Sequence, residues 1–144
     1  MINTRAWDQL LKVMFIVLIA GAMWPASYWF EVDHISVPNA KVGKPIVMEV
    51  QRSIHRPFSA DWHVVVRRRT TAGSWVITCA ADGSTDYLPE ASLPQPTTLD
   101  WWTNGRCPSL TPGTFRIHTT WQLEPQYVPT KRVTAVSNIF EVTE

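Results

Sequence analysis

The chain has 144 residues with 13 basic and 12 acidic side chains, so its formal net charge at pH 7 is only +1. Without Arg5, Lys12 and Asp8 near the N-terminus, 11 basic and 11 acidic residues remain. A balanced charge of this kind provides no electrostatic attraction for nucleic acid, so we predict no nucleic-acid partner. The part of the chain beyond residue 30 has the length of one ordinary domain with its own core.

An uncharged, apolar run extends from Val13 to Phe30. Leu10 and Leu11 lengthen this run, because the long stem of Lys12 can carry its ammonium group toward the headgroups. We predict a short cytoplasmic tail over residues 1–9 and a transmembrane signal-anchor helix over residues 10–30. The side chains expected to contact the lipid or its interface are Val13, Phe15, Ile16, Leu18, Trp24 and Trp29.

The positive charges of Arg5 and Lys12 predict a cytoplasmic N-terminus and a periplasmic or extracellular C-terminal domain, in a single-pass protein of the inner (plasma) membrane. An alternative is a signal peptide cleaved after Ala22, because residues 20–22 are small. The apolar character continues through Met23 and Trp24, which favours retention of the helix. Both alternatives place the remaining chain across a membrane.

Residues 31–144 are rich in strand patterns separated by proline and glycine. We expect seven strands, with an irregular connection over residues 82–95. The expected strands are Glu31 to Val37, Pro45 to Ile54, Ala60 to Thr70, Ser74 to Ala81, Thr97 to Trp102, Thr114 to Leu123 and Thr134 to Thr143. The chain is therefore predicted to be an all-β sandwich preceded by a single transmembrane helix.

Alternation within the expected strands predicts which side chains are buried. Val65 makes its strand apolar on both faces, which indicates a central strand. The side chains assigned to the core are Ile46, Met48, Val50, Trp62, Val64, Val66, Trp75, Ile77, Cys79, Phe115, Ile117, Thr119, Trp121 and Leu123. These sets predict a core formed between two sheets.

The segment from Leu110 to Phe115, with Pro112-Gly113 at its centre, resembles the turn that enters the penultimate strand of immunoglobulin-like and fibronectin type III-like sandwiches. Phe115 stands where those domains often have the tyrosine of a tyrosine corner. The resemblance implies a seven-stranded immunoglobulin-like sandwich. The region from Leu99 to Pro108 is similar, more loosely, to small membrane-anchored proteins encoded by bacteriophages and prophages.

The two cysteines, Cys79 and Cys107, both lie in the part of the chain expected to be exported. An oxidising compartment permits a disulfide between them. Free thiols or a metal site are the alternatives, but the chain has no CxxC and no histidine near either cysteine.

We find no motif for a nucleophile, a phosphate-binding loop or a dinucleotide site, so we predict no catalytic residues, no cofactor and no enzyme activity. The four histidines are scattered along the chain, and we predict no metal site.

Trp101, Trp102 and Arg106 are the candidate partner-binding residues, because tryptophan and arginine contribute heavily to binding hot spots. In a strand, two adjacent tryptophans face opposite sides, so one of them can lie outside the core and contact a partner. The alternative is that both rings are buried, one in the core and one under the connection over residues 82–95. We expect a membrane-anchored, non-catalytic binding or scaffolding module whose partners are the lipid around its helix and an envelope or phage protein. The alternatives are a membrane-active phage lysis or superinfection factor with a regulatory sandwich domain, and a cleaved, secreted inhibitor or enzyme.

Overall fold

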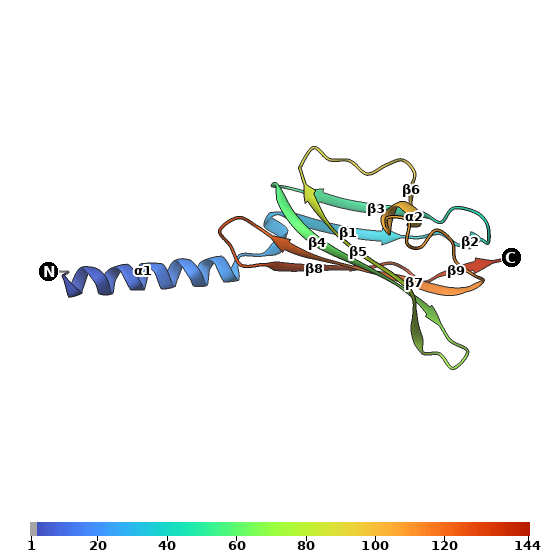
Figure 1. The fold of residues 1–144 in the computed structure, drawn as a ribbon, viewed down its shortest axis with the longest axis horizontal. Coiled ribbons are helices and arrows are strands. Elements are labelled where there is room, and N and C mark those ends of the chain that lie inside the picture. The colour runs from blue at the N-terminus through green and yellow to red at the C-terminus, as the bar shows by residue number, and fades with distance from the viewer. Residues whose placement is uncertain (1–2) are drawn as a thin grey trace.

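The structure is a computed structural model that describes residues 3–144. A long helix, α1 (Thr4–Met23), projects from one end of a β domain, and the C-terminus lies at the opposite end (Figure 1). Asn3 caps the helix by accepting a hydrogen bond from the backbone N–H of Arg5 at 3.1 Å. Pro25 follows the C-cap residue Trp24 and cannot continue the helix.

One helix among the described residues, α1, is long and apolar enough to cross a membrane by length and composition. None of its residues is buried against the domain. The helix begins at Thr4 rather than at Leu10, so the predicted boundaries of residues 10–30 are shifted toward the N-terminus. Trp29, predicted as a membrane contact, is instead buried in the β domain next to Phe30.

The domain is mostly β structure in two sheets. The first sheet has the order β1-β3-β6, and the second has the order β2-β9-β7-β4-β5, with β8 also paired to β7. Two short helices, η1 (Ala26–Tyr28) and α2 (Leu99–Trp102), precede β1 and follow β6. The strands are β1 (Phe30–Ser36), β2 (Ala40–Lys41), β3 (Val47–Ile54), β4 (Phe58–Arg69), β5 (Trp75–Tyr87), β6 (Thr97–Thr98), β7 (Gly113–Glu124), β8 (Lys131–Val136) and β9 (Phe140–Thr143).

The expectation of a mostly-β fold with two sheets and one N-terminal apolar helix is confirmed, but the expected count of seven strands is wrong. Residues 3–144 contain nine strands. The expected strand from Thr134 to Thr143 is divided into β8 and β9, because the side chains of Ser137 and Asn138 accept hydrogen bonds from the backbone N–H groups of Ile117 and Val37. The two-residue strand β2 was not expected; it pairs in parallel with β9.

The core between the sheets follows the predicted alternation in β7, where Phe115, Ile117, Thr119, Trp121 and Leu123 are all buried. Val65 is buried as well, and β4 lies between β5 and β7, so the prediction of a central strand is confirmed.

In β5 the predicted alternation fails. A register shift between Val66 and Arg67 pairs Val66 with Cys79 but Arg67 with Ile77, so Thr78 is the extra residue of a β-bulge. The bulge turns Ile77 to the outer face, where it is 61% exposed. The strand also continues to Tyr87, so the irregular connection begins after that residue rather than at Asp82.

The end of α1 is held directly against the domain. The Lys131 ammonium group, at the start of β8, donates to the backbone oxygens of Gly21 and Ala22 at 2.8 Å each. A cation is favourable there, because the unpaired carbonyls at a helix C-terminus carry partial negative charge. A Cβ placed on Gly21 would lie 3.6 Å from Val128 and 3.8 Å from Pro129, so the loop before β8 covers this small residue.

Candidate binding cleft

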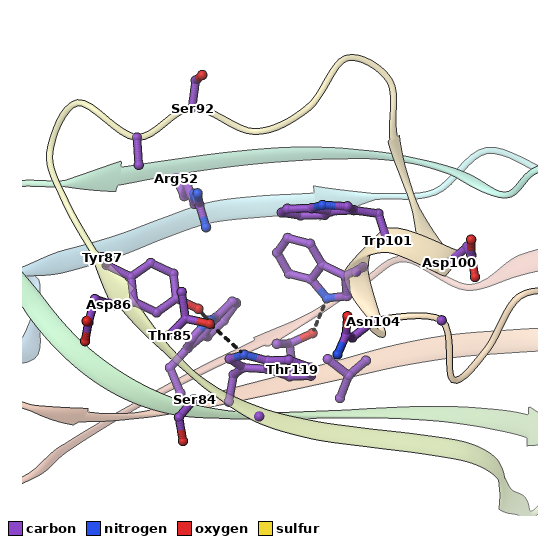
Figure 2. Close-up of a pocket in the computed structure, with 17 residues that line it drawn as sticks. Arg52, Ser84, Thr85, Asp86, Tyr87, Ser92, Asp100, Trp101, Asn104 and Thr119 are labelled. Carbon is purple, nitrogen blue, oxygen red and sulfur yellow. Dashed lines mark hydrogen bonds between the residues drawn. The ribbon is translucent and has the colours of Figure 1, made fainter.

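A cleft of about 860 Å³ opens between the two sheets beside α2. The three-stranded sheet contributes β3 to its border, and the larger sheet contributes parts of β4, β5 and β7. The connection after β5 passes over it, and α2 closes one end (Figure 2). A cleft of this size lies within the range of small-molecule binding sites.

Aromatic side chains form much of the lining, and three indole N–H groups are fixed by internal hydrogen bonds. These bonds run from Trp62 to the Thr85 hydroxyl at 3.1 Å, from Trp102 to the Thr119 hydroxyl at 3.0 Å, and from Trp121 to the Tyr87 hydroxyl at 3.2 Å. Their ring orientations are therefore set before any ligand arrives, which reduces the entropy cost of binding.

Gly83 is required for the position of the Trp62 ring. Gly83 pairs directly with Trp62 across β4 and β5, and a Cβ on Gly83 would lie only 2.6 Å from the ring. The indole therefore occupies the space that a side chain at residue 83 would need, and its nitrogen donates to the Thr85 hydroxyl. Any side chain at residue 83 would displace this wall of the cleft.

Trp101 differs from the other aromatic residues of the lining because it is 51% exposed. It lies on α2, which Thr98 caps by accepting from the Trp101 backbone N–H at 3.3 Å. Asn104 and Gly105 then take positive φ values of 52° and 77° and end the helix. Figure 2 shows the Trp101 ring extending from α2 over the cleft.

Arg52 enters the cleft from β3, and Figure 2 shows its guanidinium pointing into the space between Tyr87 and Trp101. The guanidinium carbon lies 5.6 Å from the centre of the Tyr87 ring, which is a cation–π contact. Burial lowers the pKa of Arg52 from its ordinary value, and Tyr87 offsets part of this change. Burial likewise raises the pKa of the Tyr87 hydroxyl, against the opposing effects of Trp121, Arg52 and Thr85.

The structure separates the three predicted binding residues. Trp101 is exposed and lines the cleft. Trp102 also lines the cleft but is buried, and it packs edge-on against Trp121 with ring centres 6.0 Å apart. Arg106 is exposed and is not part of the lining. The expected strand from Thr97 to Trp102 is wrong after Thr98, since Trp101 and Trp102 face different ways on a helical turn.

Cys79 and Cys107 form a disulfide, with their Cα atoms 6.2 Å apart. Cys79 lies on β5 and Cys107 follows α2, so the bond ties the segment after α2 to the larger sheet. The buried Thr103 supports the same segment: its hydroxyl donates to the Leu99 oxygen at 2.8 Å and accepts from the Cys107 backbone N–H at 3.0 Å. The helix that presents Trp101 is thus held at its C-terminal side.

The opposite face of the larger sheet carries a cluster of basic side chains. Arg67 and Arg116 are direct cross-strand partners, and His118 lies two residues along β7. Burial lowers the pKa of His118, and the charges of Arg67 and Arg116 lower it further. Within residues 3–144, no group of three or more His, Cys, Asp or Glu side chains is arranged to hold a metal ion.

Sequence reasoning did not identify Arg52, Trp62, Gly83 or Tyr87 as part of a site. Trp62 was assigned to the core. The pairing of Trp62 with Gly83 across two strands would indicate an indole that packs against a glycine, but this pairing can be recognised only once the register of β4 and β5 is known.

Comparison of the chain with protein-family models, with curated proteins and with solved structures found no match.

Proposed function

We propose that the chain is a single-pass membrane-anchored protein whose extracytoplasmic domain is a non-catalytic binding module for an envelope component. The observation that carries this proposal is the half-exposed Trp101 ring over a cleft whose other indoles are fixed by internal bonds. Exposed aromatic rings of this kind are typical anchors for a ligand. The proposed orientation has the N-terminus in the cytoplasm and the cleft in the periplasm or extracellular space.

The contacts of α1 support an anchor that is retained. Lys131 binds the carbonyls of Gly21 and Ala22, on the N-terminal side of the alternative cleavage point after Ala22. Cleavage there would remove these partners from Lys131. The twenty-residue length of α1 and the exposure of its apolar side chains suit lipid contact.

We also propose that the domain is an immunoglobulin-like sandwich. The pairing order supports this type: β1, β3 and β6 correspond to strands A, B and E of one sheet. The strands β5, β4 and β7, with β8 and β9 together, correspond to C′, C, F and G of the other sheet. A strand equivalent to D is absent from the described residues, where the connection between β5 and β6 runs over the cleft.

The membrane-active alternative finds less support. A helix that oligomerises in lipid needs small residues at its contact surface. The small residues of α1 from Ala20 to Ala22 would be its contact surface, but Val128 and Pro129 of this chain lie against Gly21 at the centre of this segment.

The test is co-sedimentation of the detergent-solubilised full chain with isolated bacterial envelopes. We expect Trp101→Ala to abolish most of the retention. Tyr127→Ala is the matched control, because Tyr127 is an exposed aromatic residue on the loop between β7 and β8 and does not line the cleft. Retention that is equal in the wild type and in Trp101→Ala would contradict the proposal. Carbonate extraction of membranes from cells that express the full chain should leave the wild type in the pellet.

A further inference from the structure

The cleft contains a positive charge without a counter-ion. The Arg52 side chain forms no salt bridge and no hydrogen bond with any residue of the described part of the chain, and its one charge-related partner is the Tyr87 ring. Arg56, which also stacks on a tyrosine ring, differs because it donates to the Tyr28 backbone oxygen at 2.9 Å. The guanidinium N–H groups of Arg52 are therefore available to donate hydrogen bonds to a ligand in the cleft.

The carboxylates of the lining lie away from Arg52. Figure 2 shows Asp86 and Asp100 at opposite ends of the cleft. Asp86 already accepts a hydrogen bond from the Ser59 hydroxyl. The middle of the cleft thus has a partly buried cation between aromatic rings, a setting in which an incoming anion would replace lost hydration. A planar guanidinium fits a carboxylate with two parallel hydrogen bonds.

The remaining lining suits a sugar. The face of an aromatic ring carries partial negative charge, which attracts the C–H groups on the flat side of a pyranose ring. The half-exposed Trp101 presents such a face. The exposed polar groups of the lining include hydroxyls and an amide, which pair well with sugar hydroxyls: Ser84, Thr85, Ser92 and Asn104.

We infer that the cleft binds a saccharide that carries a carboxylate, with the carboxylate on Arg52 and a pyranose ring against Trp101. This inference rests on the proposed function, because it uses the same cleft. It goes further by naming the class of ligand and the residue that selects it.

The experiment uses the full chain in detergent micelles and two tetrasaccharides. One alternates N-acetylglucosamine with N-acetylmuramic acid, and the other contains N-acetylglucosamine alone, so that the two differ by lactyl carboxylates. Binding is followed by isothermal titration calorimetry at low salt. We expect the acidic ligand to bind at least about 10-fold more tightly than the neutral one, and Arg52→Gln to weaken the acidic ligand by about 10- to 100-fold.

Arg56→Gln is the matched control, since it removes an arginine that stacks on a tyrosine outside the cleft. It should leave both affinities unchanged. Oligogalacturonate and its methyl ester provide a second measurement that needs no variant, because esterification removes the charge from the ligand. We expect the free acid to bind at least about 10-fold more tightly than the ester.

The outcomes separate the two proposals. Equal binding of acidic and neutral sugars that is lost in Trp101→Ala would overturn the selection by Arg52 and leave the proposed function standing. Binding of no saccharide, together with Arg52-dependent binding of a peptide through its terminal carboxylate, would overturn the ligand class. Binding of none of these probes, with no effect of Trp101→Ala on envelope retention, would overturn both.

Discussion

Reduction of the Cys79–Cys107 disulfide is expected to destabilise the β domain by several kcal/mol. The two cysteines are 28 residues apart in the sequence. The chain-entropy relation for a loop of that length predicts a loss of about 3.6 kcal/mol at 25 °C when the cross-link is opened. The reason is that the cross-link restricts the unfolded chain, which regains its freedom when the bond is reduced.

The assay is urea unfolding of the full chain in detergent micelles, followed by tryptophan fluorescence with and without reductant. With a slope of about 2 kcal/mol per molar urea, reduction should lower the midpoint by about 2 M. Comparing the oxidised and reduced wild type avoids the cavity that a substitution at the buried Cys107 would leave. The double variant Cys79→Ala/Cys107→Ala is the control, and reductant should not change its midpoint.

A difference below about 1 kcal/mol between oxidised and reduced protein would refute this reasoning. It would mean that the loop between the cysteines is already ordered in the unfolded chain or held by other contacts. The hydrogen bonds of Thr103 would then be the first contacts to remove by substitution.

Three further predictions concern stability and the junction between α1 and the β domain. Trp102→Ala should cost about 3–5 kcal/mol in urea unfolding because it empties a buried site, whereas the exposed Trp101→Ala should cost less than about 1 kcal/mol. The pKa of His118 is lowered in the folded protein, so the unfolded state binds the proton more tightly. The contribution of His118 to the free energy of unfolding should therefore be complete above the ordinary pKa of about 6.5 and should decrease as the pH falls below it. His118→Gln should flatten this part of the pH profile of stability. Lys131→Met should speed protease cleavage between residues 23 and 29 with little change in the unfolding midpoint, while Lys44→Met, at an exposed turn, should change neither.

The sequence predicted those elements whose signal is local. The alternation in β7 continues without interruption for its whole length, so the buried side chains follow directly from the pattern. The apolar N-terminal helix could be predicted because a long run of apolar residues without charges is typical of a membrane-spanning helix and of few other structures. Its start was misplaced because the polar residues from Thr4 to Gln9 can also form helix, and Asp8 and Lys12 pair at 2.7 Å along it.

The features that were missed depend on contacts between distant segments. The bulge at Thr78 reverses the faces of β5, and nothing in the apolar pattern of residues 75–79 marks it. Trp29 is of a residue type that is common at membrane interfaces, but it is buried in the domain core. The cleft likewise joins Arg52 of β3, Tyr87 of β5 and Trp101 of α2, which lie far apart in the sequence.

In the proposed topology, the junction between α1 and the domain determines how far from the membrane the cleft can bind a ligand. Only six residues separate Met23 from Phe30, part of them form η1, and Lys131 binds the end of the helix. In the proposed topology this leaves no slack tether, so the cleft stays at a nearly constant height above the bilayer and moves by diffusing sideways with its helix. The cleft can therefore bind only ligands that lie within a thin layer parallel to the membrane. It reaches a fixed ligand in that layer by two-dimensional diffusion, and it does not reach ligands held farther from the membrane.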